Sequence, residues 1–377
     1  MKTTRTGAVA ASAVASVLLL GLVAPTAASA HAAPVAVGHA QAAPGQEKQA
    51  AKHAVPFTAA TVTDHGDGTF TITWTAPGVR SVALYTGTSQ RQVDTRHVVA
   101  RGAGSGSVTV RIAAPADRRW FELVPDRGES LTLADRLVRL DGTVNFRDLG
   151  GYRTTDGQWV AMGKVYRSDA LDKLTDADLA KLRRLGIRTD VDLRTADERA
   201  AAPDRVPAGT KVVVADVLGG SIGSSFNPTS PEAAAQLMTD GERSMVSSPT
   251  AEAAYTQLFD AVSGGGAVVF HCTAGKDRTG WGAAALLTTL GVPAQDVQAD
   301  YLLSNTYRAA ANAATLAQLP AAAAAIYKPL LDVRAEYLAA GLDEVQRVFG
   351  SWDAYLRDGI AVNRGQQRAL EAQLLEG

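Results

Sequence analysis

One segment of ten residues, 271–280, constrains the fold more than any other part of the chain. It reads His-Cys-Thr-Ala-Gly-Lys-Asp-Arg-Thr-Gly, and Cys272 is the only cysteine among 377 residues. The apolar residues 267–270 predict a short buried strand before it, and 279–290 predict a helix after it. The thiol is therefore expected on a turn between the end of a strand and the start of a helix.

Such a turn suits an anion. Backbone N–H groups and the positive end of the helix dipole meet there, and the same field favours the thiolate of a cysteine. Arg278 follows Cys272 with five residues between them, and a guanidinium can grip two oxygens of a phosphate. The alternative is an inert buried thiol. The position of Cys272 beside a phosphate cradle favours transfer of a phosphoryl group to sulfur.

The order His-Cys, five residues, Arg, Thr resembles the signature of cysteine-dependent phosphatases. Ala-Gly-Lys-Asp-Arg-Thr-Gly is similar to their bacterial branch, typified by the mycobacterial protein tyrosine phosphatase B. From about Gly142 to the C-terminus, further blocks agree in order: 145–152, 165–168, 190–194 and 300–305. The resemblance implies an α/β cysteine-phosphatase fold over 141–377, with a mostly parallel sheet flanked by helices. It also implies hydrolysis of phosphomonoesters through a cysteinyl-phosphate.

The resemblance and the chemistry together predict the roles of the loop residues. Cys272 would be the nucleophile, and Arg278 would bind the equatorial phosphate oxygens. Thr279 would place a hydroxyl near the sulfur, cap the helix, or do both. Gly275 would relieve crowding where the backbone wraps the anion. The rest of the cradle would come from the loop residues Thr273, Ala274, Gly275 and Lys276.

The leaving oxygen needs a proton, and the chain has no Trp-Pro-Asp tripeptide. The resemblance implies Asp277 as the donor. The alternative is Asp240, within the stretch 219–250, which contains Gly, Ser and Pro and which we interpret as a candidate lid. Asp277 would in that case be structural, capping loop amides or pairing with Arg278.

Charged residues in the other blocks have two interpretations, substrate contact or a buried network. We expect Asp148 and Asp192 to belong to a buried Arg–Asp network, because buried charges need partners. Arg167 and Arg194 lie at the ends of predicted strands, and we expect them to contact substrate.

His271 is the only histidine after Gly142. This count excludes a His-rich metal site and argues against a cysteine protease, which needs a remote histidine as base. Adjacent side chains on an extended segment point to opposite sides, so we expect His271 to order the loop from behind. No metal and no cofactor are expected.

The N-terminal part predicts export. Residues 1–30 have a positive start, an apolar run and an Ala-Ser-Ala cleavage site, typical of a signal peptide; a membrane anchor is the alternative. Residues 31–56 are rich in Ala, Gln, Gly and Pro and predict a flexible linker. We therefore expect a secreted protein without a stable membrane anchor. The net charge of −1 gives no general attraction for nucleic acid.

Residues 57–140 have a β pattern. Alternation in 69–74 follows an Asp-Gly turn, and similar runs recur at short intervals. This predicts a small all-β sandwich of the immunoglobulin or fibronectin type III kind. Its role is open between a binding module and a spacer or lid packed on the enzyme; the second is favoured, because small sandwiches say little about function.

The substrate is left open by the sequence. The expected partner is a phosphorylated protein, with phosphotyrosine first and phosphoserine or phosphothreonine as alternatives. Lys276 adds a cation to the loop, which favours a phosphoinositide or inositol phosphate as a further alternative. A phosphate-binding adhesion module and a sulfurtransferase are two other classes. The intact Cys272, Asp277 and Arg278 argue against the first, and the loop sequence argues against the second.

Overall fold

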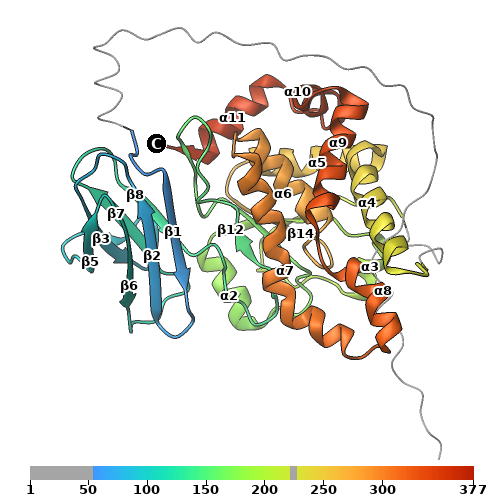
Figure 1. Cartoon of the computed structure of the whole chain (residues 1–377), viewed down its shortest axis with the longest axis horizontal. Coiled ribbons are helices and arrows are strands. Elements are labelled where there is room, and N and C mark those ends of the chain that lie inside the picture. The colour runs from blue at the N-terminus through green and yellow to red at the C-terminus, as the bar shows by residue number, and fades with distance from the viewer. Residues whose placement is uncertain (1–53, 221–226) are drawn as a thin grey trace, which may run out of the picture.

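The computed structural model describes residues 54–220 and 227–377 (Figure 1). The predicted signal peptide 1–30 and the predicted linker up to residue 53 lie outside these ranges. Val55, at the end of that predicted linker, is buried in a hydrophobic cluster with strands that follow it. Within the described ranges, no helix is both long and apolar enough to cross a membrane.

The N-terminal part of the described chain is a β-module of two antiparallel sheets (Figure 1). One sheet has the order β1-β2-β6, and the other has β4-β3-β7-β8 with β5 paired to β3. The strands are β1 (Ala59–Asp64), β2 (Thr69–Thr75), β3 (Ser81–Gly87), β4 (Val93–Asp94), β5 (Ala100–Ala103), β6 (Ser105–Arg111), β7 (Trp120–Pro125) and β8 (Leu131–Ala134). In β1 and β2, buried residues alternate with more exposed ones. One face of this sheet therefore packs inward and the other faces outward.

The C-terminal part is an α/β unit around a five-stranded sheet of order β13-β12-β14-β11-β9. All of its pairs are parallel except β11 with β9. Its strands are β9 (Arg147–Asp148), β11 (Val165–Ser168), β12 (Ile187–Asp192), β13 (Lys211–Val214) and β14 (Ala267–His271). The predicted α/β architecture with a mostly parallel sheet is confirmed.

The sequence predicts helix for almost all of the chain from residue 293 onward. The structure confirms it: helices surround the sheet and make up nearly all of this part of the chain (Figure 1). A two-stranded pair of β10 (Trp159–Val160) and β15 (Leu375–Glu376) joins the C-terminal end to the middle of the chain. The helices are α2 (Asp176–Arg184), α3 (Ala196–Ala201), α4 (Pro231–Ser247), α5 (Pro249–Ser263), α6 (Arg278–Thr289), α7 (Ala294–Leu316), α8 (Ala321–Leu331), α9 (Ala335–Phe349), α10 (Trp352–Ala354), the π-helical turn η1 (Tyr355–Gly359) and α11 (Arg364–Leu374).

The central strand β14 is buried on both faces, which explains its continuous apolar sequence. Val268 and Phe270 belong to the large cluster formed with the helices α4 to α9. Val269 belongs to a second cluster, which contains Leu182 of α2. Because neighbouring side chains point to opposite faces, the strand is clamped between two helical layers, and the loop after it has a rigid base.

The β-module packs directly on the α/β unit. Trp159 and Met162 of the α/β unit lie in the hydrophobic cluster of the module and are only 2% and 1% exposed. Arg118 of the module donates to Asp148 Oδ2 of the α/β unit at 2.5 Å, and both are buried. The two parts therefore share a core.

Two predictions from the sequence need correction. The stretch 219–250 is not one long loop, because α4 occupies most of its described part and is capped by Ser230 with Pro231 in the first turn; residues 221–226 lie outside the described ranges. The sequence of residues 212–217 predicts a buried strand, and this is wrong for β13. It is an edge strand, and Val212 and Val214 are about half exposed at 50% and 47%.

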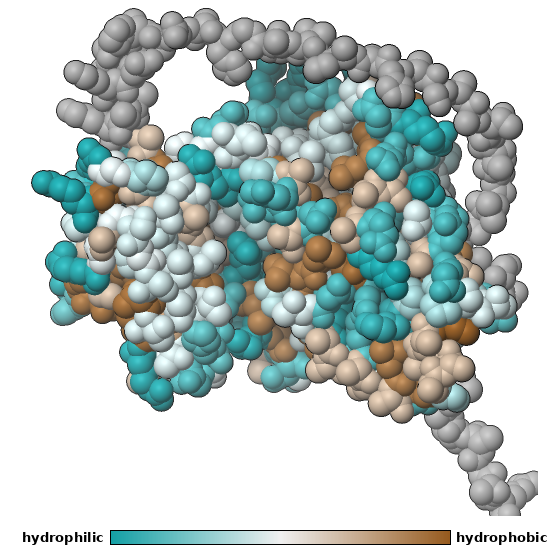
Figure 2. Space-filling model, in the orientation of Figure 1, coloured by the Kyte–Doolittle hydropathy of each residue, from teal (hydrophilic) through white to brown (hydrophobic). Residues whose placement is uncertain are grey.

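The surface over α8 is one of several apolar areas on the face drawn in Figure 2. Apolar residues gather there, since residues 321–325 are all alanine. The buried residues of this helix are only Pro329 and Leu330. Its first alanines are therefore left exposed or half-buried at the surface.

Candidate active site

The predicted loop lies between β14 and α6, as expected, and wraps around the thiol of Cys272. The N–H of Gly275 donates to Cys272 Sγ at 3.3 Å. Gly275 has φ +65°, and an added Cβ would lie 2.3 Å from the carbonyl oxygen of Ser168. Only glycine fits this position without strain. The tight turn brings loop N–H groups and the start of α6 to the sulfur.

The surroundings of Cys272 favour the thiolate. Cys272 is 1% exposed, and burial by itself raises the pKa of its thiol. The positive charge of Arg278, together with the hydroxyl and N–H of Thr279 near the sulfur, outweighs burial, so the pKa lies below its usual value. The N-cap of α6 is Asp277. Thr279 thus lies beside the sulfur and is not the cap.

Arg278 is held by a carboxylate that the sequence analysis did not single out. Its Nη1 donates to Glu198 Oε2 at 2.6 Å and its Nη2 to Glu198 Oε1 at 2.8 Å. The hydroxyl of Thr273 also donates to Glu198. Burial raises the pKa of Glu198, but these hydrogen bonds and the charge of Arg278 lower it to about 2. Glu198 is therefore ionised, and it fixes the guanidinium of Arg278 beside the loop.

Glu198 owes its position to the start of α3. It stands at the third position of the helix, where its side chain accepts from the N–H of Thr195 and the Thr195 hydroxyl accepts from its own N–H. This capping box is visible in the sequence as Thr-x-x-Glu. The pattern indicates a helix start, but it gives no sign of a partner 80 residues later.

Asp277 and Lys276 pair with each other inside the loop. Lys276 Nζ donates to Asp277 Oδ1 at 2.8 Å and to the carbonyl of Asp332 at 3.5 Å. Lys276 is 1% exposed, whereas the Asp277 side chain retains 11%. The alternative in which Asp277 pairs with Arg278 is not what the structure shows, because Arg278 pairs with Glu198.

Asp240, the alternative proton donor, is committed elsewhere. On α4 it accepts from Gln236 at 2.9 Å and from Arg243 at 2.8 Å, and its side chain is 39% exposed. These partners belong to the same helix. Asp240 is therefore part of a surface ion pair, and the hydrogen bonds of the described residues do not connect it to the loop.

A second unpredicted carboxyl, Glu242 on α4, faces the site from the interior. It is fully buried, and Tyr301 donates to its Oε1 at 2.6 Å. Burial and the negative charge of Asp277 raise the pKa of Glu242 to about 8. Its Oε2 has no hydrogen-bond partner within residues 54–220 and 227–377. Glu242 is thus a protonated carboxyl near neutral pH, held against α7.

Arg167 and Arg194, expected at the substrate, have other partners. Arg167 is 0% exposed and donates to Asp300 Oδ2 at 2.6 Å and to the carbonyl of Gly275 at 2.8 Å. Arg194 is 1% exposed and donates to both oxygens of Asp192 and to Asp204. We therefore assign Arg167 to positioning the loop and Arg194 to a network beside it, because neither guanidinium is free for a substrate.

A buried network supports the loop from behind. Asn145 donates from its amide to the carbonyls of Ala274 and Gly275 at 3.2 and 3.0 Å. Arg147 donates to Asp300 and to the side-chain oxygen of Asn145. The expected buried role of Asp192 and Asp148 is confirmed by their pairs with Arg194 and Arg118.

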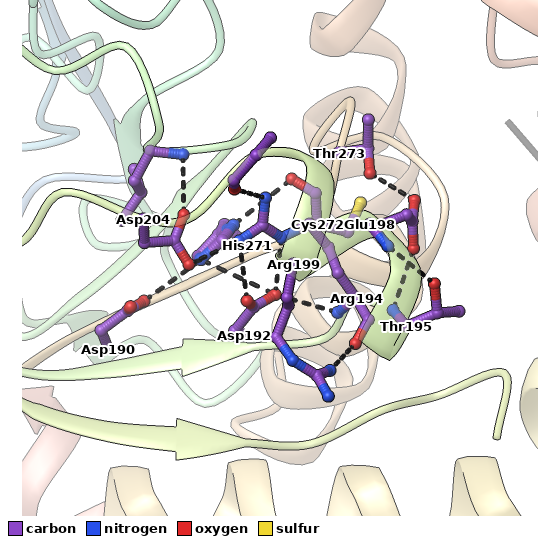
Figure 3. A network of polar contacts seen from close by, with 12 residues as sticks. Asp190, Asp192, Arg194, Thr195, Glu198, Arg199, Asp204, His271, Cys272 and Thr273 are labelled. Atoms are coloured by element: carbon purple, nitrogen blue, oxygen red, sulfur yellow. Dashed lines mark hydrogen bonds and ion pairs between the residues drawn. The ribbon is translucent and has the colours of Figure 1, made fainter. Parts of the chain in front are cut away.

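His271 points away from the thiol, as its neighbouring position predicted. Its Nδ1 lies 3.3 Å from the carbonyl of Cys272, and its Nε2 faces three aspartates (Figure 3). It thus contacts the backbone of the loop from the rear.

Comparisons with known proteins agree with this geometry. A tyrosine-protein phosphatase, by its name, of Cupriavidus necator is 36% identical over 238 residues, covering 61% of this chain and 86% of that protein. The triple specificity protein phosphatase PtpB of Mycobacterium tuberculosis is 32% identical over 269 residues, covering 60% and 96%. A solved structure of P. aeruginosa TpbA with phosphotyrosine covers 38% of this chain and 70% of its own, at 23% identity and a TM-score of 0.23, too low to add to the assignment.

The family model of tyrosine phosphatases matches residues 138–376, which is more than half of the chain and contains every loop residue described above. The sequence resemblance is therefore confirmed, and the chain belongs to the tyrosine phosphatase family, whose members are phosphoric monoester hydrolases.

Proposed function

We propose that this phosphatase hydrolyses phosphomonoesters, phosphotyrosine first, through a cysteinyl-phosphate on Cys272. The observation that carries the proposal is the arrangement of three groups around the sulfur. The Gly275 N–H and the start of α6 converge on Cys272, and Glu198 orients Arg278 beside it. A nucleophile and a phosphate cradle in one loop suit in-line phosphoryl transfer.

The reaction has two steps. First, Cys272 Sγ bonds to phosphorus while the ester P–O bond breaks, and the leaving oxygen takes a proton from Asp277. Arg278 and the loop N–H groups stabilise the charge on the equatorial oxygens. Second, a water attacks phosphorus and gives its proton to Asp277 while the S–P bond breaks. The thiolate and the protonated acid are restored, and phosphate leaves.

Asp277 is the preferred acid because of its place and its exposure. It directly precedes Arg278 at the start of α6, and its side chain is partly open at 11%. Asp240 is held by Gln236 and Arg243 on the outside of α4. A proton donor must come within hydrogen-bond reach of the leaving oxygen, and a residue of the loop meets this condition directly.

The mechanism is tested by trapping the intermediate. We expect rapid acid quenching during turnover of p-nitrophenyl phosphate to yield a peptide that carries one phosphoryl group on Cys272. Cys272→Ser should bind phosphate without turnover. A phosphoryl group on another residue, or normal hydrolysis by Cys272→Ser, would rule out this nucleophile.

The substrate range depends on which cationic side chains near the loop are free to bind a further phosphate group. Lys276 suggested phosphoinositides, but its ammonium group donates to Asp277 and Asp332 and is almost fully buried. This weakens the case for a multiply phosphorylated lipid and favours phosphotyrosine. The mycobacterial relative is named for triple specificity, so turnover should be compared on phosphotyrosine, phosphoserine and phosphothreonine peptides and on phosphoinositides. A kcat/KM highest for a phosphoinositide would reverse the order.

We also propose that the enzyme is exported and that its β-module is an immunoglobulin- or fibronectin-like sandwich with a supporting role. The first rests on the signal pattern of 1–30. The second rests on the two antiparallel sheets and on Trp159 and Met162, which complete the module's core. N-terminal sequencing of protein from the culture medium should begin at His31; a protein retained in the cytosol with residues 1–30 intact would contradict export.

A further inference from the structure

A cluster of two carboxylates and an imidazole lies behind the catalytic loop (Figure 3). Asp190 comes from β12, His271 from the end of β14, and Asp204 from the segment after α3. One potential ligand atom of each lies within 4.8 Å of the others. Neighbouring parallel strands bring the first two together, since Asp192 of β12 pairs in register with His271.

The cluster contains polar atoms without hydrogen bonds. Asp190 and His271 are both 0% exposed. Among the described residues, none makes a hydrogen bond with either oxygen of Asp190 or with Nε2 of His271. A buried carboxylate in this state is costly unless a cation compensates it. These atoms point toward one another, so the missing partner belongs between them.

The separations fit a shared metal ion better than direct hydrogen bonds. His271 Nε2 lies 3.4 Å from Asp190 Oδ1 and 3.2 Å from Asp204 Oδ2. Charge-assisted N–H···O bonds are about 2.7–2.9 Å long. Two ligands of one tetrahedral zinc ion, each about 2.0–2.1 Å from the metal, lie about 3.3 Å apart. The two distances from His271 Nε2 are those of neighbouring ligands, and all three potential ligand atoms lie within 4.8 Å of one another.

The charges also call for a divalent cation. The carboxylates of Asp190, Asp192 and Asp204 face this space, and the nearby guanidinium of Arg194 bonds to Asp192 and Asp204. Burial lowers the pKa of His271, but the carboxylates, Asp190 first, raise it well above its usual value, so without an ion the imidazole holds a proton. A metal ion would take the place of that proton. Three negative groups, one guanidinium and a neutral imidazole then leave two negative charges. A divalent ion would neutralise them, and nitrogen and carboxylate ligands suit zinc.

The tautomer of His271 is compatible with this role. Its Nδ1 lies 3.3 Å from the carbonyl oxygen of Cys272. With the proton on Nδ1, the Nε2 lone pair is directed at the two carboxylates. Metal-bound histidines commonly donate their other ring N–H to a carbonyl or carboxylate in this way.

We propose that Asp190, Asp204 and His271 form a binding site for a divalent metal ion, zinc by its ligand set, behind the catalytic loop. The ion would tie the segment that carries Asp204 to the ends of β12 and β14. A metal ion would enter past Asp204, because the side chain of Asp204 is 10% exposed whereas those of Asp190 and His271 are fully buried. The histidine count excluded a His-rich site, but it does not exclude a site with one histidine and two carboxylates.

The experiment measures metal binding in the Cys272→Ser protein, where the thiolate cannot compete as a ligand. After equilibration with Zn²⁺ and gel filtration, we expect about one zinc ion per chain. Asp190→Asn in the same background should weaken zinc binding at least about tenfold. The matched control is Asp358→Asn, which removes an exposed carboxylate paired with Arg357 and should bind zinc unchanged.

A second measurement keeps the test decisive if Asp190→Asn does not fold. Co²⁺ bound to the Cys272→Ser protein should give the visible absorption of a tetrahedral ion with nitrogen and oxygen ligands. Absence of bound metal, six-coordinate cobalt or equal zinc affinity of a folded Asp190→Asn variant would each overturn the proposal. In that case His271 carries a proton on Nε2, and the resulting imidazolium compensates the charge of the neighbouring carboxylates.

Discussion

Arg278 and Glu198 form a two-pronged ion pair, with Nη1 to Oε2 at 2.6 Å and Nη2 to Oε1 at 2.8 Å. The pair is nearly closed to solvent, with side-chain exposures of 9% and 5%. The guanidinium that would grip the phosphate is therefore oriented before substrate arrives. Pre-orientation of this kind lowers the cost of binding the transition state.

Replacing Glu198 by Gln should lower kcat/KM about 100-fold, because the guanidinium loses its charged anchor and a small misplacement of a catalytic group has that effect. The measurement is steady-state hydrolysis of p-nitrophenyl phosphate. Glu336→Gln is the control, since Glu336 is exposed and pairs only loosely with Arg334 at 3.6 Å. Unchanged kcat/KM in Glu198→Gln would mean that Arg278 is positioned by the loop alone.

Asp277→Asn should separate substrates by their leaving groups. Phenyl phosphate, with a poor leaving group, should be turned over about 100-fold more slowly, because its phenoxide needs a proton in the transition state. p-Nitrophenyl phosphate should be affected much less. Asp240→Asn should leave both rates unchanged, because Asp240 lies in a surface pair with Arg243. The opposite pattern would place the acid on α4.

Arg118→Met should destabilise the junction between the β-module and the α/β unit. It leaves the buried carboxylate of Asp148 without its cation, and breaking such a pair typically costs about 3–5 kcal/mol. The measurement is the free energy of unfolding in urea. Arg80→Met is the matched control, because the Arg80–Asp126 pair has one side chain 90% exposed and should cost less than about 1 kcal/mol. Equal losses would show that the junction contributes no special stability.

The same junction changes the expectation for a truncated enzyme. All of the sequence blocks that resemble the phosphatases lie after residue 142. The sequence alone therefore suggests that residues 31–140 can be removed without loss of the active site. The structure predicts instead an insoluble chain, because Trp159 and Met162 would lose the module that buries them. A soluble truncation that still hydrolyses p-nitrophenyl phosphate would show that the two parts fold independently.

The loop was predictable because its information is local. Cys272, Gly275 and Arg278 lie within seven consecutive residues on one strand–turn–helix segment, and glycine, cap and period patterns act over such distances. The partners of the loop were not predictable in this way. Glu198 meets Arg278 across 80 residues, and Tyr301 meets Glu242 across 59. Such pairs depend on how the helices pack on the sheet.

The predictions that were wrong also failed for physical reasons. The sequence of β13 is apolar, but the burial of its side chains depends on what covers each face of the strand, and Val212 and Val214, which share one face, stay about half exposed. For α4, the start signals Ser230 and Pro231 were present and were outweighed by the Gly, Ser and Pro residues nearby. Arg167 and Arg194 lie at strand ends as expected, yet their charges are used for internal pairs.

The last prediction concerns stability and Glu242. Burial raises the pKa of this carboxyl from its usual 4.5 to about 8 in the folded protein. Between these two values the folded protein keeps a proton that the unfolded chain has lost. The free energy of unfolding should therefore fall as pH rises through this window, by about 1.4 kcal/mol per pH unit from this group. Above pH 8 the contribution should be constant.

Glu242→Gln should remove this dependence, because an amide cannot ionise and its oxygen can still accept from Tyr301. The variant should match the unmodified enzyme near pH 4.5 and be more stable than it at pH 8.5, as measured by urea unfolding at both values. Glu371→Gln, at an exposed position on α11, should leave the pH profile unchanged. If Glu242→Gln has the same slope as the unmodified enzyme, Glu242 is already ionised when buried, and Lys276 is the group that compensates its charge.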